Sequence, residues 1–397
     1  RATKRRVIKR TEGQTVMRPV TRGSEAAEEP IMYIFNNEDD EGFTIIAANK
    51  DYEPLIAVTE YGNYTYGEPT GVEPFDNYME DVVEAYSLII PIIPIDPDDP
   101  DDPDDPYIPE PGCIVDTVQY NHVEYGPYLV TKWGQSGIYG SEASNGLAGC
   151  GPTAMAQIMA YHRRPSSLEI TYTFREPDLV LNWDELIEHY SGIGYSGLNG
   201  WYCNCGCDYE TLSKLMREIG HRAGASYNDG QTSTDEYDIR NGFNNLNYTA
   251  TVNNDLVFEI TSWHSTVKSD IISDLSNRKP LIMCGVDDDE GHAWVVDGYM
   301  KHDHKFDYYF QNYDTTDPSD YVYSHTNENH YEVLHFNWGW NGRCDGWFSH
   351  GCLRTNNAMD YDDDSLNNNI DYNFIWQNEL IQNIAPTWTI IPITPVQ

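Results

Sequence analysis

The stretch LAGCGPTAMAQIMAYH, residues 147–162, is apolar on nearly every face from Cys150 to Tyr161, and it therefore predicts a buried helix. Cys150 stands at the first turn, where Pro152 is tolerated because its missing N–H would have no partner there. A helix N-terminus carries partial positive charge, so we expect it to stabilise a thiolate and lower the pKa of Cys150. Taken alone, Cys150 is equally well interpreted as a buried structural cysteine.

A second motif, Gly291-His-Ala-Trp-Val-Val-Asp-Gly298, offers a base for that thiol. His292 stands at the start of an apolar strand and follows a glycine, so we expect it to face an open edge. There it can accept the thiol proton and later protonate a leaving amine. A histidine without the other motifs would be interpreted as structural or merely exposed.

Two further segments supply supporting groups. In Glu332-Val-Leu-His-Phe-Asn-Trp-Gly-Trp-Asn-Gly342, Asn337 is expected to orient the imidazole and Trp338 to shield the pair from water. In Lys132-Trp-Gly-Gln135, upstream of Cys150, the amide of Gln135 can join the Cys150 backbone N–H in binding an oxyanion. The alternative interpretations are an aromatic strand end in the core and an exposed polar loop.

A proline- and aspartate-rich stretch, PIIPIDPDDPDDPDDPYIPEPG at residues 91–112, divides the chain. Proline fixes φ and the aspartates repel one another, so this stretch predicts an extended, semi-rigid linker. Residues 1–90 before it predict a small α+β unit that would be only marginally stable alone. Its expected elements are strands at 31–35, 42–47 and 54–59 and a helix that begins near Pro74.

Residues 113–397 after the linker predict a larger α+β domain, because helices come first and strands follow. The expected helices are 150–161 and 209–223. The expected strands are 281–286, 293–299, 308–312 and 332–338.

Composition excludes several classes of partner. The 397 residues hold 24 Lys and Arg against 64 Asp and Glu, a formal net charge of −40, which disfavours nucleic acids and anionic membrane surfaces. No apolar run approaches the roughly 18 residues that span a bilayer. The basic first ten residues, RATKRRVIKR, are followed by no apolar run, so we recognise no signal peptide in the chain and expect an exposed leader there.

Eight cysteines are too few for a disulfide scaffold in a chain of this length. The cluster Cys203-Asn-Cys-Gly-Cys207 is interpreted as free thiols or as partners in disulfides with Cys113 or Cys344, with a metal site as the alternative. We expect no cofactor and no metal ion.

Together the motifs resemble the streptopain family of papain-like cysteine peptidases. The resemblance is carried, in order, by GCGPTAMAQIMAYH, GHAWVVDG, HFNWGWNG and DGWF, and it extends over roughly residues 120–385. Residues 31–63 resemble the family's pro-segment. Gly151-Pro152 departs from the Val-Ala usual after the cysteine, and the loop 225–234 departs from the family's small-residue substrate loop.

The resemblance implies an α+β fold: a papain-like two-lobed domain, with a helical lobe and an antiparallel sheet lobe, preceded by a small α+β pro-domain. It implies Cys150 as nucleophile, His292 as base and Gln135 as oxyanion donor. It leaves open whether Asn337 or Trp338 orients the imidazole.

The expected function is a cysteine endopeptidase zymogen that is secreted or located at the cell surface or in the periplasm. Its expected partners are protein or peptide substrates and its own pro-segment, which blocks the cleft as an intramolecular inhibitor until it is cleaved. No Lys or Arg lies between Lys50 and Lys132, so we expect cleavage by another specificity, such as self-cleavage. The alternatives are a papain-like amidase or transamidase and a catalytically silent surface-binding protein.

Overall fold

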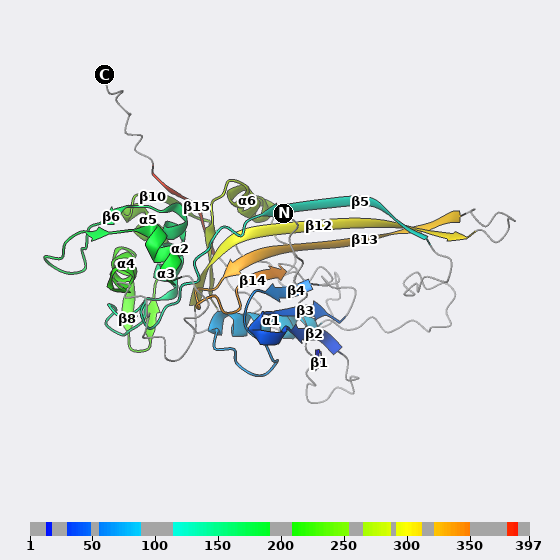
Figure 1. Cartoon of the computed structure of the whole chain (residues 1–397), viewed down its shortest axis with the longest axis horizontal. Coiled ribbons are helices and arrows are strands. Elements are labelled where there is room, and N and C mark those ends of the chain that lie inside the picture. The colour runs from blue at the N-terminus through cyan, green and yellow to red at the C-terminus, as the bar shows by residue number, and fades with distance from the viewer. Residues whose placement is uncertain are drawn as a thin grey trace, which may run out of the picture.

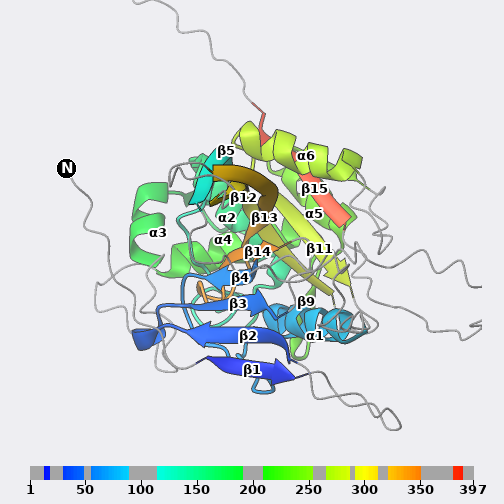
Figure 2. The ribbon, with the colours of Figure 1, turned by 90° about the vertical axis from the view of Figure 1, so that its right-hand side faces the viewer.

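A computed structural model of the chain describes residues 13–17, 30–48, 55–88, 114–190, 209–253, 265–286, 291–311, 321–349 and 379–387. Most strands join one antiparallel sheet of 11 strands in the order β1-β2-β3-β4-β14-β13-β12-β11-β15-β10, with β5 paired to β12 (Figure 2). Its strands are β1 Gln14–Met17, β2 Pro30–Asn36, β3 Phe43–Ala47, β4 Leu55–Thr59, β5 Ile114–Tyr125, β10 Tyr248–Asn253, β11 Leu281–Val286, β12 Gly291–Gln311, β13 Tyr321–Asn337, β14 Gly346–Ser349 and β15 Glu379–Pro386.

Helices α2 to α5 gather at one end of the sheet, and α1 packs beside the N-terminal strands (Figure 1). The helices are α1 Glu73–Leu88, α2 Cys150–His162, α3 Trp183–Tyr190, α4 Tyr209–Arg222, α5 Glu236–Asn245 and α6 Ser265–Ser276. The remaining elements are the one-turn helix η1 Glu38–Asp40 and two small hairpins, formed by β6 Ser167–Leu168 with β7 Leu179–Val180 and by β8 Ser226–Asn228 with β9 Gln231–Ser233. Among the described residues, no helix is both long and apolar enough to cross a membrane.

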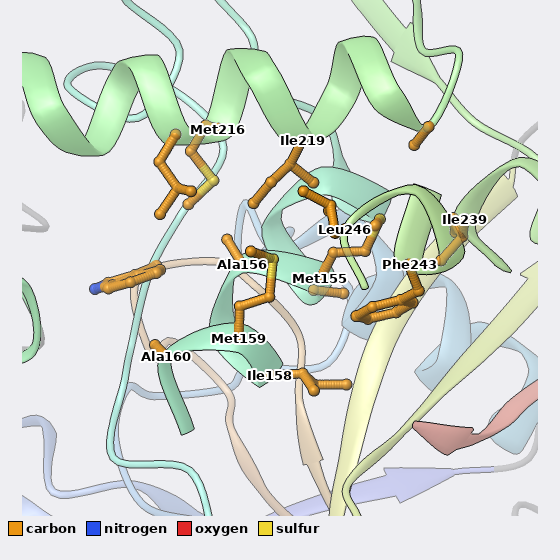
Figure 3. Packing of buried hydrophobic residues seen from close by; sticks show 14 of the residues in the cluster. Met155, Ala156, Ile158, Met159, Ala160, Met216, Ile219, Ile239, Phe243 and Leu246 are labelled. Atoms are coloured by element: carbon orange, nitrogen blue, oxygen red, sulfur yellow. The ribbon is translucent and has the colours of Figure 1, made fainter. Parts of the chain in front are cut away.

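Strands β11 and β12 separate two hydrophobic cores. Side chains alternate between the faces of a strand, and on β12 Ala293 and Val295 face the helices, whereas Trp294 and Val296 face the other core. We call the first the helical-lobe core; α2 lies at its centre, with Met155, Ile158 and Met159 packed against α4 and α5 (Figure 3). Ten consecutive residues of α2, 151–160, are buried, which confirms the helix predicted from its apolar sequence.

The second core, which we call the N-terminal core, joins the described residues of the N-terminal unit to the sheet lobe. Strand β4 pairs with β14, with Val58 opposite Trp347 and Ala57 opposite Phe348. Phe75 of α1 and Phe43 of β3 pack in the same cluster as Phe348. The predicted strands and helix of this unit are confirmed, and its sheet is continuous with that of the larger domain. A unit this small is only marginally stable alone, so extending another sheet adds to its stability.

The strand predictions for residues 293–299 and 308–312 were wrong in one respect: residues 293–299 and 308–311 lie in the single strand β12, and residue 312 is outside the described part of the chain. Between these two segments, alternate positions carry charged side chains, so one face of the strand is polar and the apolar pattern is interrupted. These residues are Lys301, Asp303, Lys305 and Asp307. With β5 and β13 on either side, β12 forms a long three-stranded ribbon that projects from the body (Figure 1). The linker 91–112 and the cluster Cys203–Cys207 lie outside the described residues.

Candidate active site

Cys150 is the first residue of α2, and the turn before it is built on glycine. Gly149 caps the helix with φ 93, and its carbonyl accepts the Thr153 N–H at 3.1 Å. A Cβ at Gly149 would lie 2.7 Å from Thr232 Cγ2, so only glycine fits here without strain. The β8–β9 hairpin therefore packs directly against the approach to the half-buried Cys150 thiol.

His292 is the second residue of β12. The backbone N–H of the next residue, Ala293, contacts the Cys150 sulfur, so the helix and the strand meet at this point. The ring Nε2 of His292 lies 3.0 Å from the backbone carbonyl of Trp338. The imidazole also stacks with Trp294, with ring centroids 6.2 Å apart, and lies 5.1 Å from the Trp340 ring centroid.

Burial keeps both groups of this pair uncharged. It raises the pKa of the Cys150 thiol, against the lowering effect of backbone hydrogen bonds from Ala293 and Gly151. It lowers the pKa of His292 to about 4, although the Trp338 carbonyl favours the charged ring. The helix N-terminus led us to expect a lowered thiol pKa, and that prediction is wrong for the full chain, because the desolvation of the thiolate outweighs the helix dipole.

Gln135 brings a donor to the same region. Its backbone carbonyl accepts the Ala148 N–H at 2.7 Å, which ties its loop to the segment just before Cys150. Its side-chain Nε2 is buried and has no hydrogen-bond partner among the described residues. An unsatisfied buried donor is costly, and an oxyanion would satisfy it.

The structure separates the two residues that the sequence offered as partners of the imidazole. The Asn337 amide accepts hydrogen bonds from Gln157 Nε2 at 2.9 Å and from the Gly339 N–H at 3.1 Å, and it donates to the Thr131 carbonyl at 2.9 Å. The Trp338 carbonyl contacts His292, and the Trp338 N–H donates to Asp345 at 2.9 Å. Asn337 therefore stabilises the turn at residues 337–339, while the Trp338 carbonyl contacts the imidazole of His292.

Sequence reasoning missed Gln157 and Asp345, which are both buried and bonded to this turn. A signal was available for Gln157, because it is an amide within an otherwise apolar helical run. Among the described residues, no group of three or more His, Cys, Asp or Glu side chains could hold a metal ion.

A cysteine at the head of a buried helix, facing an antiparallel sheet that carries the histidine, defines the architecture of a papain-like cysteine peptidase. The model of the peptidase C10 family matches residues 133–348, and the chain belongs to this family. A second model, the Spi protease inhibitor, matches residues 2–83, so the N-terminal segment is inhibitor-like.

Individual relatives agree with this assignment. The chain is 24% identical over 346 residues to streptopain of Streptococcus pyogenes serotype M28, covering 80% of this chain and 73% of the relative. It is 23% identical over the same length to streptopain of serotype M1. The structure of a mutant fragment of prointerpain A from Prevotella intermedia superimposes with a TM-score of 0.51 at 19% identity, covering 93% of this chain and 98% of that one. This structural likeness shows the same fold.

Proposed function

We propose that this C10 cysteine peptidase is the zymogen of a secreted endopeptidase in which Cys150 is the nucleophile and His292 the general base. The observation that carries the proposal is the backbone hydrogen bond from Ala293 to the Cys150 thiol, because Ala293 directly follows His292 in β12. It joins a helix and a strand that are more than a hundred residues apart in sequence.

The tautomer of His292 suits this role. Since Nε2 faces the Trp338 carbonyl, which can only accept, Nε2 of the neutral ring carries the proton. Nδ1 is then left with a lone pair, and it can take the proton of the thiol. The Trp338 carbonyl is therefore proposed as the group that orients the base.

The reaction follows from these positions. The Cys150 thiolate attacks the peptide carbonyl carbon, and the carbonyl oxygen becomes an oxyanion bound by Gln135 Nε2 and the Cys150 backbone N–H. The protonated His292 then donates its proton to the leaving amine as the C–N bond breaks. Water, deprotonated by His292, hydrolyses the thioester and restores the thiol.

The N-terminal unit, residues 1–90, is proposed as the intramolecular inhibitor, released by cleavage in the linker 91–112. Its described contacts reach two segments that carry proposed catalytic groups. Glu60 binds Lys132, at 2.7 Å, in the loop that leads to Gln135. The Tyr78 ring of α1 packs against Trp338 with centroids 6.2 Å apart. These contacts support the proposal that the N-terminal unit restrains the segments of Gln135 and Trp338. Blockage of the cleft by this unit stays a prediction.

The test is to treat the protein with an epoxide-type thiol inhibitor, before and after removal of residues up to Gly112, and to locate the adduct by mass spectrometry. We expect an adduct on Cys150 that forms faster after removal and is abolished by His292→Ala. The thiol of Cys284 is the internal control, because it is buried in the helical-lobe core, to which the N-terminal unit contributes no residue, and it should stay unlabelled in both forms. Slow labelling of all cysteines in both forms would contradict an activated Cys150.

Secretion and the maturation site are tested separately. Mature enzyme recovered from the medium of the producing bacterium should begin within residues 91–112 or near Cys113. An N-terminus at Trp133 would contradict the proposed processing, because it would remove Lys132 from the loop that carries Gln135.

A further inference from the structure

Gln157 lies two turns into α2 and is fully buried in the middle of the helical lobe, at 0% exposure. Burying an amide costs free energy unless its donor and its acceptor are both paired. Both are paired here: Gln157 Oε1 accepts the Trp133 N–H at 3.2 Å, and Gln157 Nε2 donates to Asn337 Oδ1 at 2.9 Å.

Backbone groups fix the orientation of both amides. The Trp133 N–H can only donate, so it requires the oxygen of Gln157. Asn337 Oδ1 accepts a hydrogen bond from the Gly339 N–H at 3.1 Å, and Asn337 Nδ2 donates to the Thr131 carbonyl at 2.9 Å, so the two ends of this amide cannot exchange roles. The chain of hydrogen bonds therefore has one direction and needs a donor and an acceptor at position 157.

This chain of hydrogen bonds connects the three segments that the proposed mechanism uses. Residues 131–133 lead into Gln135, helix α2 begins with Cys150, and Asn337 and Gly339 flank Trp338, whose carbonyl faces His292. Asn341 extends the connection, since its N–H donates to the Trp133 carbonyl at 3.3 Å.

We infer that Gln157 is a positioning residue for peptide hydrolysis: it sets the oxyanion donor and the orientation of the base relative to the nucleophile. This inference rests on the proposed roles of Cys150, His292 and Gln135. Gln157 touches none of the reacting atoms and acts through the backbone of Trp133 and the side chain of Asn337. A misplacement of a catalytic group by about 1 Å can lower a rate by about 100-fold. Gln157 is bonded both to the segment before Gln135 and to Asn337 beside Trp338, so its loss should lower kcat strongly.

Two substitutions separate the hydrogen bonds from the space that the side chain fills. Gln157→Met keeps the length and apolar stem but removes the donor and the acceptor. Gln157→Glu keeps the acceptor, and only its protonated form restores the donor toward Asn337. Burial raises the pKa of a carboxyl, so this variant should regain function as the pH falls. Tyr248→Phe is the matched control, because it removes one buried hydrogen bond, to the Arg164 carbonyl at 2.7 Å, beyond the opposite end of α2.

The experiment uses the full chain with a site for an unrelated protease placed in residues 91–112, cut after folding, so that maturation does not depend on the variant's own activity. Peptide hydrolysis is measured per Cys150 titrated with the epoxide inhibitor, which counts only folded, labelled sites. We expect Gln157→Met to lower kcat by about 100-fold with KM within about twofold, and Tyr248→Phe to leave both near wild type. Relative to wild type, Gln157→Glu should be at least about tenfold more active at pH 5 than at pH 8.

A double-mutant cycle with Gln135→Ala supplies the decisive readout. If Gln157 acts through the oxyanion donor, Gln135→Ala should lower kcat far less in the Gln157→Met background than in the wild type. Fully additive losses, or a kcat for Gln157→Met within about threefold of wild type, would overturn the inference while leaving the proposed function intact. Failure of the proposed function has a different mark, namely hydrolysis that persists in Cys150→Ala.

Discussion

Glu60 links the N-terminal unit to the catalytic domain through a charged cluster at their junction. Its carboxylate lies 2.7 Å from Lys132 Nζ and 3.6 Å from His335 Nε2, and His335 Nδ1 lies 2.6 Å from Asp297 Oδ1. The Glu60 N–H also donates to the Asp345 carbonyl at 2.9 Å. The interaction with His335, aided by Lys132 and opposed by burial, lowers the pKa of Glu60 to about 2. Burial alone would lower the pKa of His335, but Asp297 and Glu60 outweigh it and raise that pKa to about 9.

These shifts define the pH window in which the cluster stabilises the full chain. The lowered pKa of Glu60 means that its contribution is present above its ordinary value of 4.5 and is lost as the pH falls through about 2. The raised pKa of His335 means that its contribution is complete below its ordinary value of 6.5 and is lost as the pH rises through about 9. Both contributions are therefore present between those two ordinary values.

We predict that Glu60→Gln destabilises the full chain by about 1–2 kcal/mol at pH 5.5. The Glu60 side chain is 43% exposed, so solvent screens its interaction with Lys132. The His335 side chain is only 6% exposed, so its interaction with Glu60 accounts for most of the loss in stability. The loss should shrink to about half or less at pH 10, where His335 is neutral.

The assay is urea unfolding of the full chain at pH 5.5 and pH 10, in a Cys150→Ala background that prevents self-cleavage. Glu68→Gln, on the exposed surface of the same unit, is the control for removal of a carboxylate and should change stability by less than about 0.5 kcal/mol. An equal loss at both pH values, or no loss at pH 5.5, would refute the role assigned to His335.

Three further predictions concern the core and the candidate site. Phe348→Ala should lower the free energy of unfolding in urea by about 3–5 kcal/mol, because the ring is fully buried and stacks on Phe336 with centroids 5.2 Å apart. A decrease below about 1 kcal/mol would contradict the shared N-terminal core. Gly149→Ala should lower kcat by at least about tenfold, since its φ of 93 and the nearby Thr232 methyl oppose a Cβ; unchanged kinetics would contradict the tight turn. In the full chain, alkylation of Cys150 should accelerate only at pH values above the ordinary pKa of a thiol, because burial raises the pKa of Cys150. A rate that is already maximal at pH 7 would contradict a neutral Cys150 thiol.

Much of the fold could be predicted from local sequence patterns. Helix α2 was predicted because its sequence is apolar on nearly every face, which is the pattern of a helix with ten buried residues. The strands and the helix of the N-terminal unit were predicted from alternation and from the spacing of apolar residues. The centre of β12 was not, because the alternation there puts charged residues on one face, and the pairing with β5 and β13 that makes it one continuous strand is a tertiary feature.

The order and chemical type of the candidate groups follow from the sequence alone, as does the family resemblance that the C10 model confirms. The tertiary structure, in contrast, sets what each group contacts. It assigned the Trp338 carbonyl to the imidazole and Asn337 to Gln157, although the two residues are adjacent in sequence. It also reversed the expected pKa shift of Cys150, since desolvation depends on everything packed around a group. Residue type and spacing are properties of the chain, whereas hydrogen-bond partners and local dielectric arise only when distant segments meet.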